Sequence, residues 1–245
     1  MKTIFASDFD NTLYFRGSFR ETDCKAISDF QKDGMFFGLA TGRSLEGILT
    51  PTKGQIDCDF YLLVTGSYLL SKNKELFYNK PIGEEEALRF LREYEDRFSI
   101  ALNTGKEYLP YSDPLCCFHK EGPLSSDPIY CLSVYTGSEE KAKEEKRIIE
   151  KNYPSFTAHR NGEFLDITDC TCSKGTAIDR LRKRIPGGRI FAIGDNENDI
   201  PLLEASDVAF TFYSSSDSVK SYADYLVDSV EEALAIVRRL TQESR

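Results

Sequence analysis

The sequence lacks a long hydrophobic run, because none of its apolar stretches approaches the roughly 20 residues that a membrane-spanning helix needs. Its start, MKTIFASDFDN, reaches Asp8 before the apolar core of a signal peptide could form. Basic clusters are also missing: 31 Lys and Arg residues face 40 Asp and Glu residues, for a net charge of −9. Since a nucleic-acid backbone is bound by clustered basic residues, we expect a cytoplasmic protein that binds neither nucleic acid nor a membrane.

Cysteine and histidine are scarce, and their spacing is not typical of a disulfide scaffold or a zinc site. The chain has seven Cys, an odd number, and two His (His119 and His159), with no Cys-x-x-Cys pair. A disulfide scaffold and a zinc site are therefore both unexpected in a chain of this length. The pair Cys170 and Cys172 leaves a redox role open as an alternative, but we favour reduced thiols with a structural role.

The chain does contain enough apolar material for a folded protein. Hydrophobic residues make up 40% and charged residues 29% of its 245 positions, which separates it from disordered chains. This length suits one large domain or two small ones. We expect a monomer or a weak homo-oligomer.

Apolar runs and helical patterns alternate in the first and last thirds of the chain. We expect strands at residues 3–7, 35–40, 60–64, 189–193 and 208–212, and helices at 22–33, 44–49, 174–184, 201–205 and 230–241. The first helix is expected to have Thr22 as its N-cap and to stop at Gly34. Strands that alternate with helices predict an α/β fold, a doubly wound parallel sheet with right-handed crossovers.

The middle of the chain has a different pattern. We expect helices at residues 84–97 and 139–152, a strand at 129–135, and strands at 156–159 and 163–168 joined by a turn at Asn161-Gly162. This order predicts an α+β unit at residues 81–168, inserted into a core made of residues 1–80 and 169–245. Its hinges would lie near residues 79–81 and 169–172.

Two acidic clusters follow predicted buried strands. Asp8 and Asp10 are two residues apart and lie on one face of the chain, where their repulsion favours a bound cation. Asp195 and Asp199 lie between a predicted strand and the helix that follows it. Their carboxylate oxygens are ligands that suit Mg²⁺. The alternatives are a polar turn for the first cluster and a capped acidic loop for the second. The first is not an EF-hand loop, because the glycine and the final acidic residue of that loop are missing.

Two further clusters supply groups that bind anions. Thr41, Gly42 and Arg43 follow a predicted strand, where a hydroxyl and free backbone N–H groups can hold an anion. A simple strand-to-helix turn explains them equally well. Ser173 is a good N-cap, and it places Lys174 in the first turn of a helix, where a cation opposes the helix dipole. Lys174 is therefore either a tolerated surface residue or a cation held there to neutralise an anion.

The arrangement of the four clusters is more informative than any one of them. All four lie at predicted carboxyl ends of parallel strands or at the helix starts beside them, where open α/β sheets bind ligands. Together they supply a carboxylate nucleophile, a metal site, a hydroxyl donor and a cation. This set matches phosphoryl transfer through an aspartyl-phosphate.

The motifs resemble those of a known superfamily. Residues 8–13 (DFDNTL), 41–43 (TGR), 174–175 (KG) and 194–199 (GDNEND) look like the four motifs of the haloacid dehalogenase superfamily, and their order and spacing resemble its Cof-type subfamily IIB phosphatases. Asn11 stands where the family often has Gly, and residues 65–67 (TGS) stand where it usually has an Asn-Gly-Ala-like turn. The resemblance implies a Rossmann-like core with an α+β cap of the C2 type.

The resemblance also implies catalytic roles for individual residues. Asp8 would be the nucleophile that takes the phosphoryl group, and Asp10 would protonate the leaving oxygen and then deprotonate the attacking water. Thr41, with Gly42 and Arg43, would bind the phosphoryl oxygens or the substrate. Lys174 would neutralise the phosphate and orient Asp8.

By the same resemblance the chain would bind Mg²⁺. Asp8 and Asp195 would be direct ligands, Asp10 would bind through its backbone carbonyl, and Asp199 would act through water or through Lys174. Asn198 would help to order the phosphate. Mg²⁺ and Lys174 would then screen the repulsion between a carboxylate and a phosphate dianion.

The expected activity is hydrolysis of small phosphorylated metabolites, with sugar phosphates as the favoured class. The inserted unit would close over the cleft as a cap, exclude water and select the leaving group. Its selecting residues are not identified by the sequence; for His119 and Arg160 a surface role is favoured over a role in the cleft.

Three other interpretations stay open. A phosphomutase of the same superfamily would return the phosphoryl group to another hydroxyl of the sugar. A phospho-acceptor domain resembling bacterial receivers also uses Asp, Thr and Lys, although its phosphorylated Asp follows the third strand and Asp8 follows the first. A non-catalytic metabolite-binding module is disfavoured because no catalytic group is missing.

Overall fold

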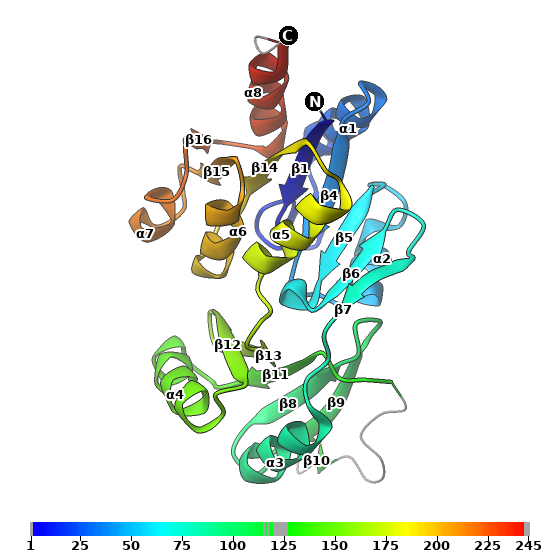
Figure 1. Cartoon of the computed structure of the whole chain (residues 1–245). Helices are drawn as coiled ribbons and strands as arrows, with labels where there is room; N and C mark the ends of the chain where they lie inside the picture. The colour runs from blue at the N-terminus through cyan, green and yellow to red at the C-terminus, as the bar shows by residue number, and fades with distance from the viewer. Residues whose placement is uncertain (1, 115, 117, 120–126, 243–245) are drawn as a thin grey trace.

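The computed structural model describes residues 2–114, 116, 118–119 and 127–242, which form two lobes (Figure 1). The first, which we call the core lobe, is built on an eight-stranded sheet. The second, the cap lobe, is built on a six-stranded sheet from the middle of the chain. The chain enters the cap lobe after β7 (Leu76–Asn79) and leaves it after β13 (Phe164–Asp169).

The core lobe has a central sheet with helices on both faces. Its remaining strands are β1 (Lys2–Ser7), β4 (Phe36–Ala40), β5 (Phe60–Leu63), β6 (Tyr68–Ser71), β14 (Gly188–Ile193), β15 (Val208–Phe212) and β16 (Tyr225–Val227). Its helices are α1 (Glu21–Lys32), α2 (Leu45–Thr52), α5 (Lys174–Arg184), α6 (Ile200–Ala205), α7 (Asp217–Lys220) and α8 (Val230–Gln242). It also contains two 3₁₀ turns, η1 (Val64–Gly66) and η2 (Glu197–Asp199), and a small hairpin, β2 (Tyr14–Phe15) with β3 (Ser18–Phe19).

The strand order in the core sheet is β16-β15-β14-β1-β4-β5-β6-β7. The strands from β16 to β5 run parallel, and β6 and β7 are antiparallel additions at one edge. The carboxyl ends of the central strands β14, β1 and β4 therefore open onto one edge of the sheet. The cap lobe lies over that edge (Figure 1), which is where open α/β sheets bind ligands.

The central strands bury both of their faces. Phe5 of β1 packs in the cluster that includes residues of α1 and α8, whereas its neighbours Ile4 and Ala6 pack in the cluster that includes residues of α5 and α6. This alternation follows from the two-residue period of a strand. Burial of both faces also explains why these strands appear in the sequence as continuous apolar runs. The predicted doubly wound α/β fold is confirmed.

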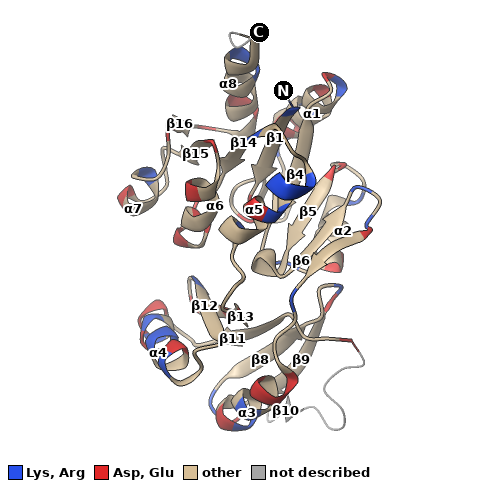
Figure 2. Ribbon diagram, in the orientation of Figure 1, with Lys and Arg blue, Asp and Glu red and all other residues tan. Residues whose placement is uncertain are grey.

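The cap lobe is an antiparallel sheet backed by two helices. Its sheet order is β10-β9-β8-β11-β13-β12. The remaining elements are α3 (Glu84–Tyr94), β8 (Ser99–Asn103), β9 (Tyr108–Asp113), β10 (Phe118–His119), β11 (Cys131–Tyr135), α4 (Glu139–Asn152) and β12 (Phe156–Asn161). Apolar residues of α3 and α4 pack on one face of the sheet, and the charged residues of both helices are visible in Figure 2.

Several predicted elements are confirmed in detail and one cap is wrong. α4, α5 and β15 have the predicted bounds, and Ser173 caps α5 through a capping box with Thr176. The predicted N-cap Thr22 is wrong: α1 starts at Glu21, after Arg20, and has no side-chain cap. Acidic residues in the first turn of α1 stabilise this start through the helix dipole instead.

Elements that the sequence analysis did not predict are mostly short. β2, β3, β6, β7, β10, β16 and α7 have two to four residues each, too few for a clear period. β8 and β9 were also missed, and β9 contains Pro110, which usually argues against a strand. Pro110 is accommodated beside a register irregularity between Ile100 and Ala101 of β8.

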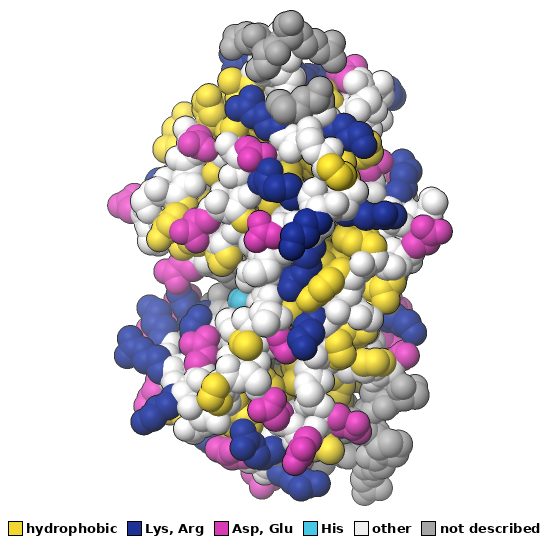
Figure 3. All heavy atoms as spheres, viewed as in Figure 1, with side chains coloured by type: hydrophobic (Ala, Val, Ile, Leu, Met, Phe, Trp, Pro, Cys, Tyr) yellow, Lys and Arg dark blue, Asp and Glu magenta, His cyan; other side chains and the backbone are white. Residues whose placement is uncertain are grey.

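Charged side chains are spread over the visible surface of both lobes. Figure 3 shows charged and apolar side chains mixed over both lobes on one face, with Lys and Arg gathered around α5, whose last turn contains basic residues. No helix in the described ranges is both long and apolar enough to cross a membrane. Cys170 is an exposed free thiol and Cys172 a buried one, at the chain's return to the core lobe; Cys117 lies outside the described residues.

Stability should fall in mild acid because of His159. Its imidazole shares a 3.0 Å hydrogen bond with Thr168, and burial lowers its pKa to about 4. The unfolded chain therefore binds a proton between about pH 6.5 and 4 that the folded chain does not, so this contribution to stability is complete above pH 6.5 and is lost as the pH falls. The slope from this residue should reach up to about 1.4 kcal/mol per pH unit.

The test compares urea unfolding of wild type and His159→Gln at several pH values from 7.5 to 4.5. The difference between the two free energies of unfolding should shift in favour of the variant as the pH falls, and carboxylates common to both proteins cancel from it. A difference that is independent of pH would contradict this role of His159.

Candidate active site

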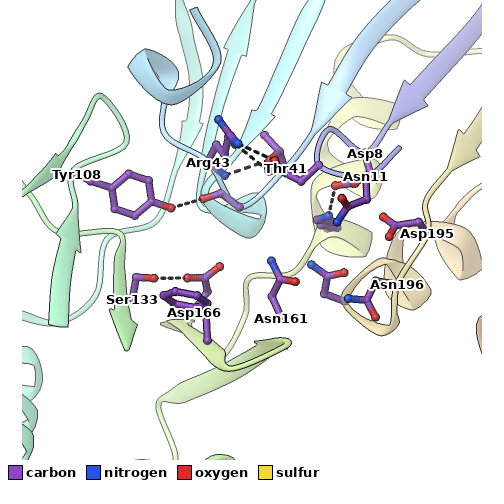
Figure 4. A pocket seen from close by; sticks show the side chains of 15 residues that line it. Asp8, Asn11, Thr41, Arg43, Tyr108, Ser133, Asn161, Asp166, Asp195 and Asn196 are labelled. Carbon is purple, nitrogen blue, oxygen red and sulfur yellow. Dashed lines mark hydrogen bonds and ion pairs between the residues drawn. The ribbon is translucent and has the colours of Figure 1, made fainter. Parts of the chain in front are cut away.

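A cavity of about 270 Å³ lies between the two lobes (Figure 4). The core lobe lines it with Asp8, Asp10, Asn11, Thr41, Gly42, Arg43, Lys174, Asp195, Asn196 and Asn198. The cap lobe lines it with Tyr108, Ser133, Asn161, Phe164 and Asp166. All four clusters singled out from the sequence thus converge on one cavity, and Asp199 lies directly behind it in contact with Lys174.

Asp8 is held at the carboxyl end of β1, in the middle of the core sheet. Its backbone N–H donates to the carbonyl of Ile193, the last residue of β14, so the side chain is fixed between two central strands. The carboxylate is buried, and burial, with the nearby Asp199, raises its pKa well above the ordinary value. Lys174 opposes that rise and keeps a cation within 2.6 Å of Asp8 Oδ1.

Lys174 is a buried cation between two carboxylates. Its Nζ lies 2.6 Å from Asp8 Oδ1 and 2.5 Å from Asp199 Oδ1, and the side chain is only 2% exposed. Burial alone would lower the pKa of Lys174, but Asp199 and Asp8 raise it, so the amine stays charged. The interpretation of Lys174 as a surface residue is therefore wrong. The capping box at Ser173 offsets the cost of a cation in the first helical turn.

Asp199 connects Lys174 to the loop that follows β14. One carboxylate oxygen contacts Lys174, and the other accepts hydrogen bonds from the backbone N–H groups of Asp195 (3.1 Å) and Asn196 (3.2 Å). These bonds tie the loop after β14 to the lysine. Gly194 permits the close approach, since a Cβ there would lie 2.4 Å from the Cβ of Asp199.

Asp195 faces the cavity from the same loop. Its Oδ1 accepts a 3.1 Å hydrogen bond from the buried hydroxyl of Thr12, which follows β1. Burial, and then the neighbouring Asp199, raise the pKa of Asp195 to about 6. Burial and a neighbouring carboxylate both disfavour the charged form, which a nearby cation would favour.

The donor set fits a hard divalent cation. Carboxylate oxygens of Asp8, Asp195 and Asp199 all lie within 4.8 Å of one another. The buried Oδ1 of Asn198 has no hydrogen-bond partner in the part of the chain that the structure describes, so it is a further free oxygen near these carboxylates. Oxygen-only donors of this kind suit Mg²⁺, which takes one or two carboxylates and keeps waters or phosphate oxygens.

The carboxylate of Asp10 is not in that cluster. Arg43 donates two hydrogen bonds to it, from Nε (2.8 Å) and Nη2 (2.6 Å). The Arg43 guanidinium also lies over the rings of Phe9 and Tyr14. A bidentate pair of this kind fixes the orientation of both groups. Asn11 has φ +59°, a left-handed backbone conformation that favours Gly. Gly is the residue that the family often has at this position.

Thr41 and Gly42 form the turn after β4. The buried Thr41 accepts a 3.2 Å hydrogen bond from the backbone N–H of Arg43, and its own N–H donates to Leu62 of the next strand. The carbonyl of Gly42 accepts a 3.0 Å hydrogen bond from the hydroxyl of Tyr108, which belongs to the cap lobe. Figure 4 shows Tyr108 pointing toward this turn from β9.

The cap residues of the cavity were not found by the sequence analysis. They come from β9, β11, β12 and β13: Tyr108, Ser133, Asn161, Phe164 and Asp166. One signal was available. Asp166 is a single carboxylate between Leu165 and Ile167, both fully buried, and such an acid faces the opposite side of the sheet from its neighbours.

The two cap residues considered from the sequence have different outcomes. Arg160 bridges the lobes: its Nη2 pairs with Glu197 of η2, and its Nη1 lies 3.6 Å from Glu139 of α4. It does not line the cavity. The side chain of His119 lies outside the described residues.

Comparisons with known proteins find similarity along nearly the whole chain. A family model described as haloacid dehalogenase-like hydrolase matches residues 5–240. A protein of Bacillus subtilis (strain 168) named "Putative phosphatase YkrA" is 22% identical over 243 residues, which cover 94% of this chain and 93% of the relative.

Solved structures share the fold. A haloacid dehalogenase-like hydrolase from Bacteroides thetaiotaomicron has a TM-score of 0.82 at 19% identity, over 97% of this chain and 100% of that chain. A structure described as the subclass IIB sugar phosphatase BT4131 has a TM-score of 0.76 at 17% identity, over 99% of each chain.

Replacing Lys174 should destabilise the protein strongly. Lys174→Met leaves Asp8 and Asp199 buried without their cation, which should lower the free energy of unfolding by about 3–5 kcal/mol at pH 7 in metal-free buffer. The control is Lys183→Met, an exposed lysine on the same helix, for which a change within about 0.5 kcal/mol is expected. Equal effects of the two substitutions in urea unfolding would contradict the burial of the Lys174 charge.

Proposed function

The chain belongs to the haloacid dehalogenase-like hydrolases, and from that premise we propose that it is a Mg²⁺-dependent phosphatase that hydrolyses small phosphorylated metabolites through an aspartyl-phosphate. The observation that carries this proposal is the convergence of Asp8, Lys174 and Asp195 on one cavity. Attack on a phosphate needs a nucleophile and nearby positive charge, and this cavity offers the Asp8 carboxylate, the Lys174 cation and a second carboxylate that suits a metal ion.

The reaction would take place in two steps. In the first, a carboxylate oxygen of Asp8 attacks phosphorus, the bond between phosphorus and the leaving oxygen breaks, and Asp10 gives that oxygen a proton. In the second, Asp10 takes a proton from a water molecule, whose oxygen attacks the phosphorus of the acyl phosphate. This step frees the Asp8 carboxylate and releases inorganic phosphate.

The other residues of the cavity would bind and orient. Thr41 would donate its hydroxyl to a phosphoryl oxygen, with Gly42 and Arg43 beside it, and Asn198 would order the phosphate. Lys174 would neutralise the phosphoryl charge while Asp199 keeps the lysine in place. Arg43 pairs with both oxygens of Asp10 in this arrangement, and Asp10 would leave that pair when it carries the proton for the leaving oxygen.

Asp8 and Asp195 would hold the metal directly, Asp10 through its backbone carbonyl and Asp199 through water. A bound Mg²⁺ supplies positive charge next to the phosphate, which lowers the repulsion between two anions. Without such a charge, Asp8 faces the nearby Asp199 and Asp195, both of which raise its pKa.

Residues 81–168 would act as a cap on a core of residues 1–80 and 169–245. The cap lobe touches the core lobe through hydrogen bonds from the N–H groups of Leu45 and Glu46 to the carbonyls of Gly105 and Lys106, 2.9 Å each. In this arrangement of the lobes the cavity of about 270 Å³ lies just below the roughly 300–1,000 Å³ typical of small-molecule sites. Small metabolites therefore fit, and the sugar phosphatase among the similar structures supports sugar phosphates as the substrate class.

Asp8→Asn should abolish turnover and keep the fold. Because the amide is a poor nucleophile, we expect phosphate release from p-nitrophenyl phosphate to fall at least ~10³-fold. Removal of one buried negative charge should not lower the melting temperature. The control Asp217→Asn, at a fully exposed carboxylate, should keep wild-type activity. Activity retained by Asp8→Asn would refute its role as the nucleophile.

Metal removal should stop the reaction reversibly. Wild-type protein treated with EDTA should lose hydrolysis of p-nitrophenyl phosphate, and added Mg²⁺ should restore it, because the carboxylate cluster needs a cation before it accepts a phosphate dianion. With a hexose 1-phosphate the product should be free phosphate; an isomeric hexose phosphate would identify a mutase instead. No metal-dependent turnover on this compound or on a broad panel of phosphorylated metabolites would defeat the proposal.

A further inference from the structure

The cap lobe presents one carboxylate to the cavity. Ser133 of β11 and Asp166 of β13 are directly opposite each other in the antiparallel pair, and the Ser133 hydroxyl donates a 2.8 Å hydrogen bond to Asp166 Oδ1. The residues on either side of Asp166, Leu165 and Ile167, pack in the cap core. By the alternation of a strand, Asp166 and Ser133 therefore face the cavity, as Figure 4 shows.

The other oxygen of Asp166 lies next to the phosphate-binding turn. A Cβ built on Gly42 would be 3.0 Å from Asp166 Oδ2, so the cap carboxylate lies almost against the turn that begins with Thr41. Burial raises the pKa of Asp166, and the Ser133 hydroxyl and the charge of Lys174 oppose that rise. A leaving group attached to a phosphate in this cavity would have Asp166 as a neighbour.

The charges around the cavity are unbalanced on the cap side. The described cap residues that line it include Asp166 and no cation. The two cations in the lining, Arg43 and Lys174, belong to the core lobe, and each is already paired, with Asp10 and with Asp8 and Asp199 respectively. A second anionic group on the substrate would therefore meet a carboxylate and find no unpaired cation in this lining.

We propose that Asp166 is a specificity-determining residue, which accepts hydrogen bonds from a hydroxyl or ammonium group of the leaving group and rejects substrates that carry a second negative charge. This inference rests on the proposed phosphatase function and adds to it the charge class of the substrate. Ser133 orients Asp166 through its hydrogen bond, whereas the repulsion of an anion depends on the charge of Asp166 alone. Hydroxyl and ammonium donors satisfy a half-buried carboxylate, whereas a second anion close to it is repelled.

Three hexose derivatives of similar size provide the test: glucose 6-phosphate (neutral leaving group), glucosamine 6-phosphate (cationic) and 6-phosphogluconate (anionic). The measurement is kcat/KM for each with wild type, Asp166→Asn and the control Glu163→Gln, in excess Mg²⁺ at pH 7. Glu163 is an exposed carboxylate of the same hairpin that does not line the cavity, so its removal changes the net charge equally. Ser133→Ala, which keeps the Asp166 charge, is the second variant.

Wild type should turn over 6-phosphogluconate at least ~10-fold less efficiently than glucose 6-phosphate, with glucosamine 6-phosphate no worse than glucose 6-phosphate. Asp166→Asn should raise the ratio of 6-phosphogluconate to glucosamine 6-phosphate by ~10-fold or more, while Glu163→Gln leaves it within about twofold. Ser133→Ala should preserve rejection of the anion. An unchanged ratio in Asp166→Asn, or equal use of the anionic and neutral substrates by wild type, would overturn the proposal.

Hydrolysis of p-nitrophenyl phosphate separates this inference from the function on which it rests. If wild type hydrolyses that compound and the ratios do not move, only the role of Asp166 fails. If the three sugars are poor substrates, their inhibition constants against p-nitrophenyl phosphate must give the same ranking, and no inhibition by any of them would also refute it. If no phosphate is released from any compound, the phosphatase function fails, and calorimetric affinities of the three sugars for wild type and Asp166→Asn decide on Asp166.

Discussion

The buried contact of Lys174 with Asp8 and Asp199 is the constraint on which the rest of the structure depends. Three charged groups in the interior are tolerated only when each is paired, because an unpaired one costs several kcal/mol. The contact joins the end of the first strand, the start of α5 and the loop after β14, which are 166 and 25 residues apart in sequence. The central order β14-β1-β4 and the close packing of α5 bring these segments to one point.

That constraint extends outward from the lysine. Asp199 uses its second oxygen to hold the backbone of the loop that carries Asp195, so Asp195, which we propose as a metal ligand, and Lys174 are positioned by one residue. Gly66 has a similar role on the other side: with φ +87° and a hypothetical Cβ only 2.1 Å from the carbonyl of Ser173, it lets the turn after β5 lie directly against the start of α5. A side chain there would displace the helix that supplies Lys174.

The buried strands of the core lobe and the longer cap elements were predictable, whereas the short edge elements and the strands β8 and β9 were not, for a physical reason. Strands buried on both faces appear as apolar runs, so β1, β4, β5, β14 and β15 and the polar residues that follow them could be located by inspection. β9 carries Pro110 and pairs across an irregular register, which hides its period. Alternation in β13 shows only that Asp166 faces away from the cap core. That this face of the cap sheet, with Tyr108 and Ser133, meets the core lobe depends on how the two lobes pack, which no local pattern encodes.

In the first turn of α2, two backbone N–H groups donate to carbonyl groups of the cap lobe. The N–H groups of Leu45 and Glu46, which a helix cannot satisfy internally, donate to Gly105 and Lys106 on the β8–β9 loop. If the lobes separated, water would replace the carbonyls as acceptors for both amides, and such an exchange changes the free energy by only about 0.5–1.5 kcal/mol for each bond. These two amides would therefore oppose an opening of the lobes only weakly, and most of the resistance would come from Tyr130 of the cap lobe, whose ring packs 5.0 Å from that of Tyr68 in the core lobe.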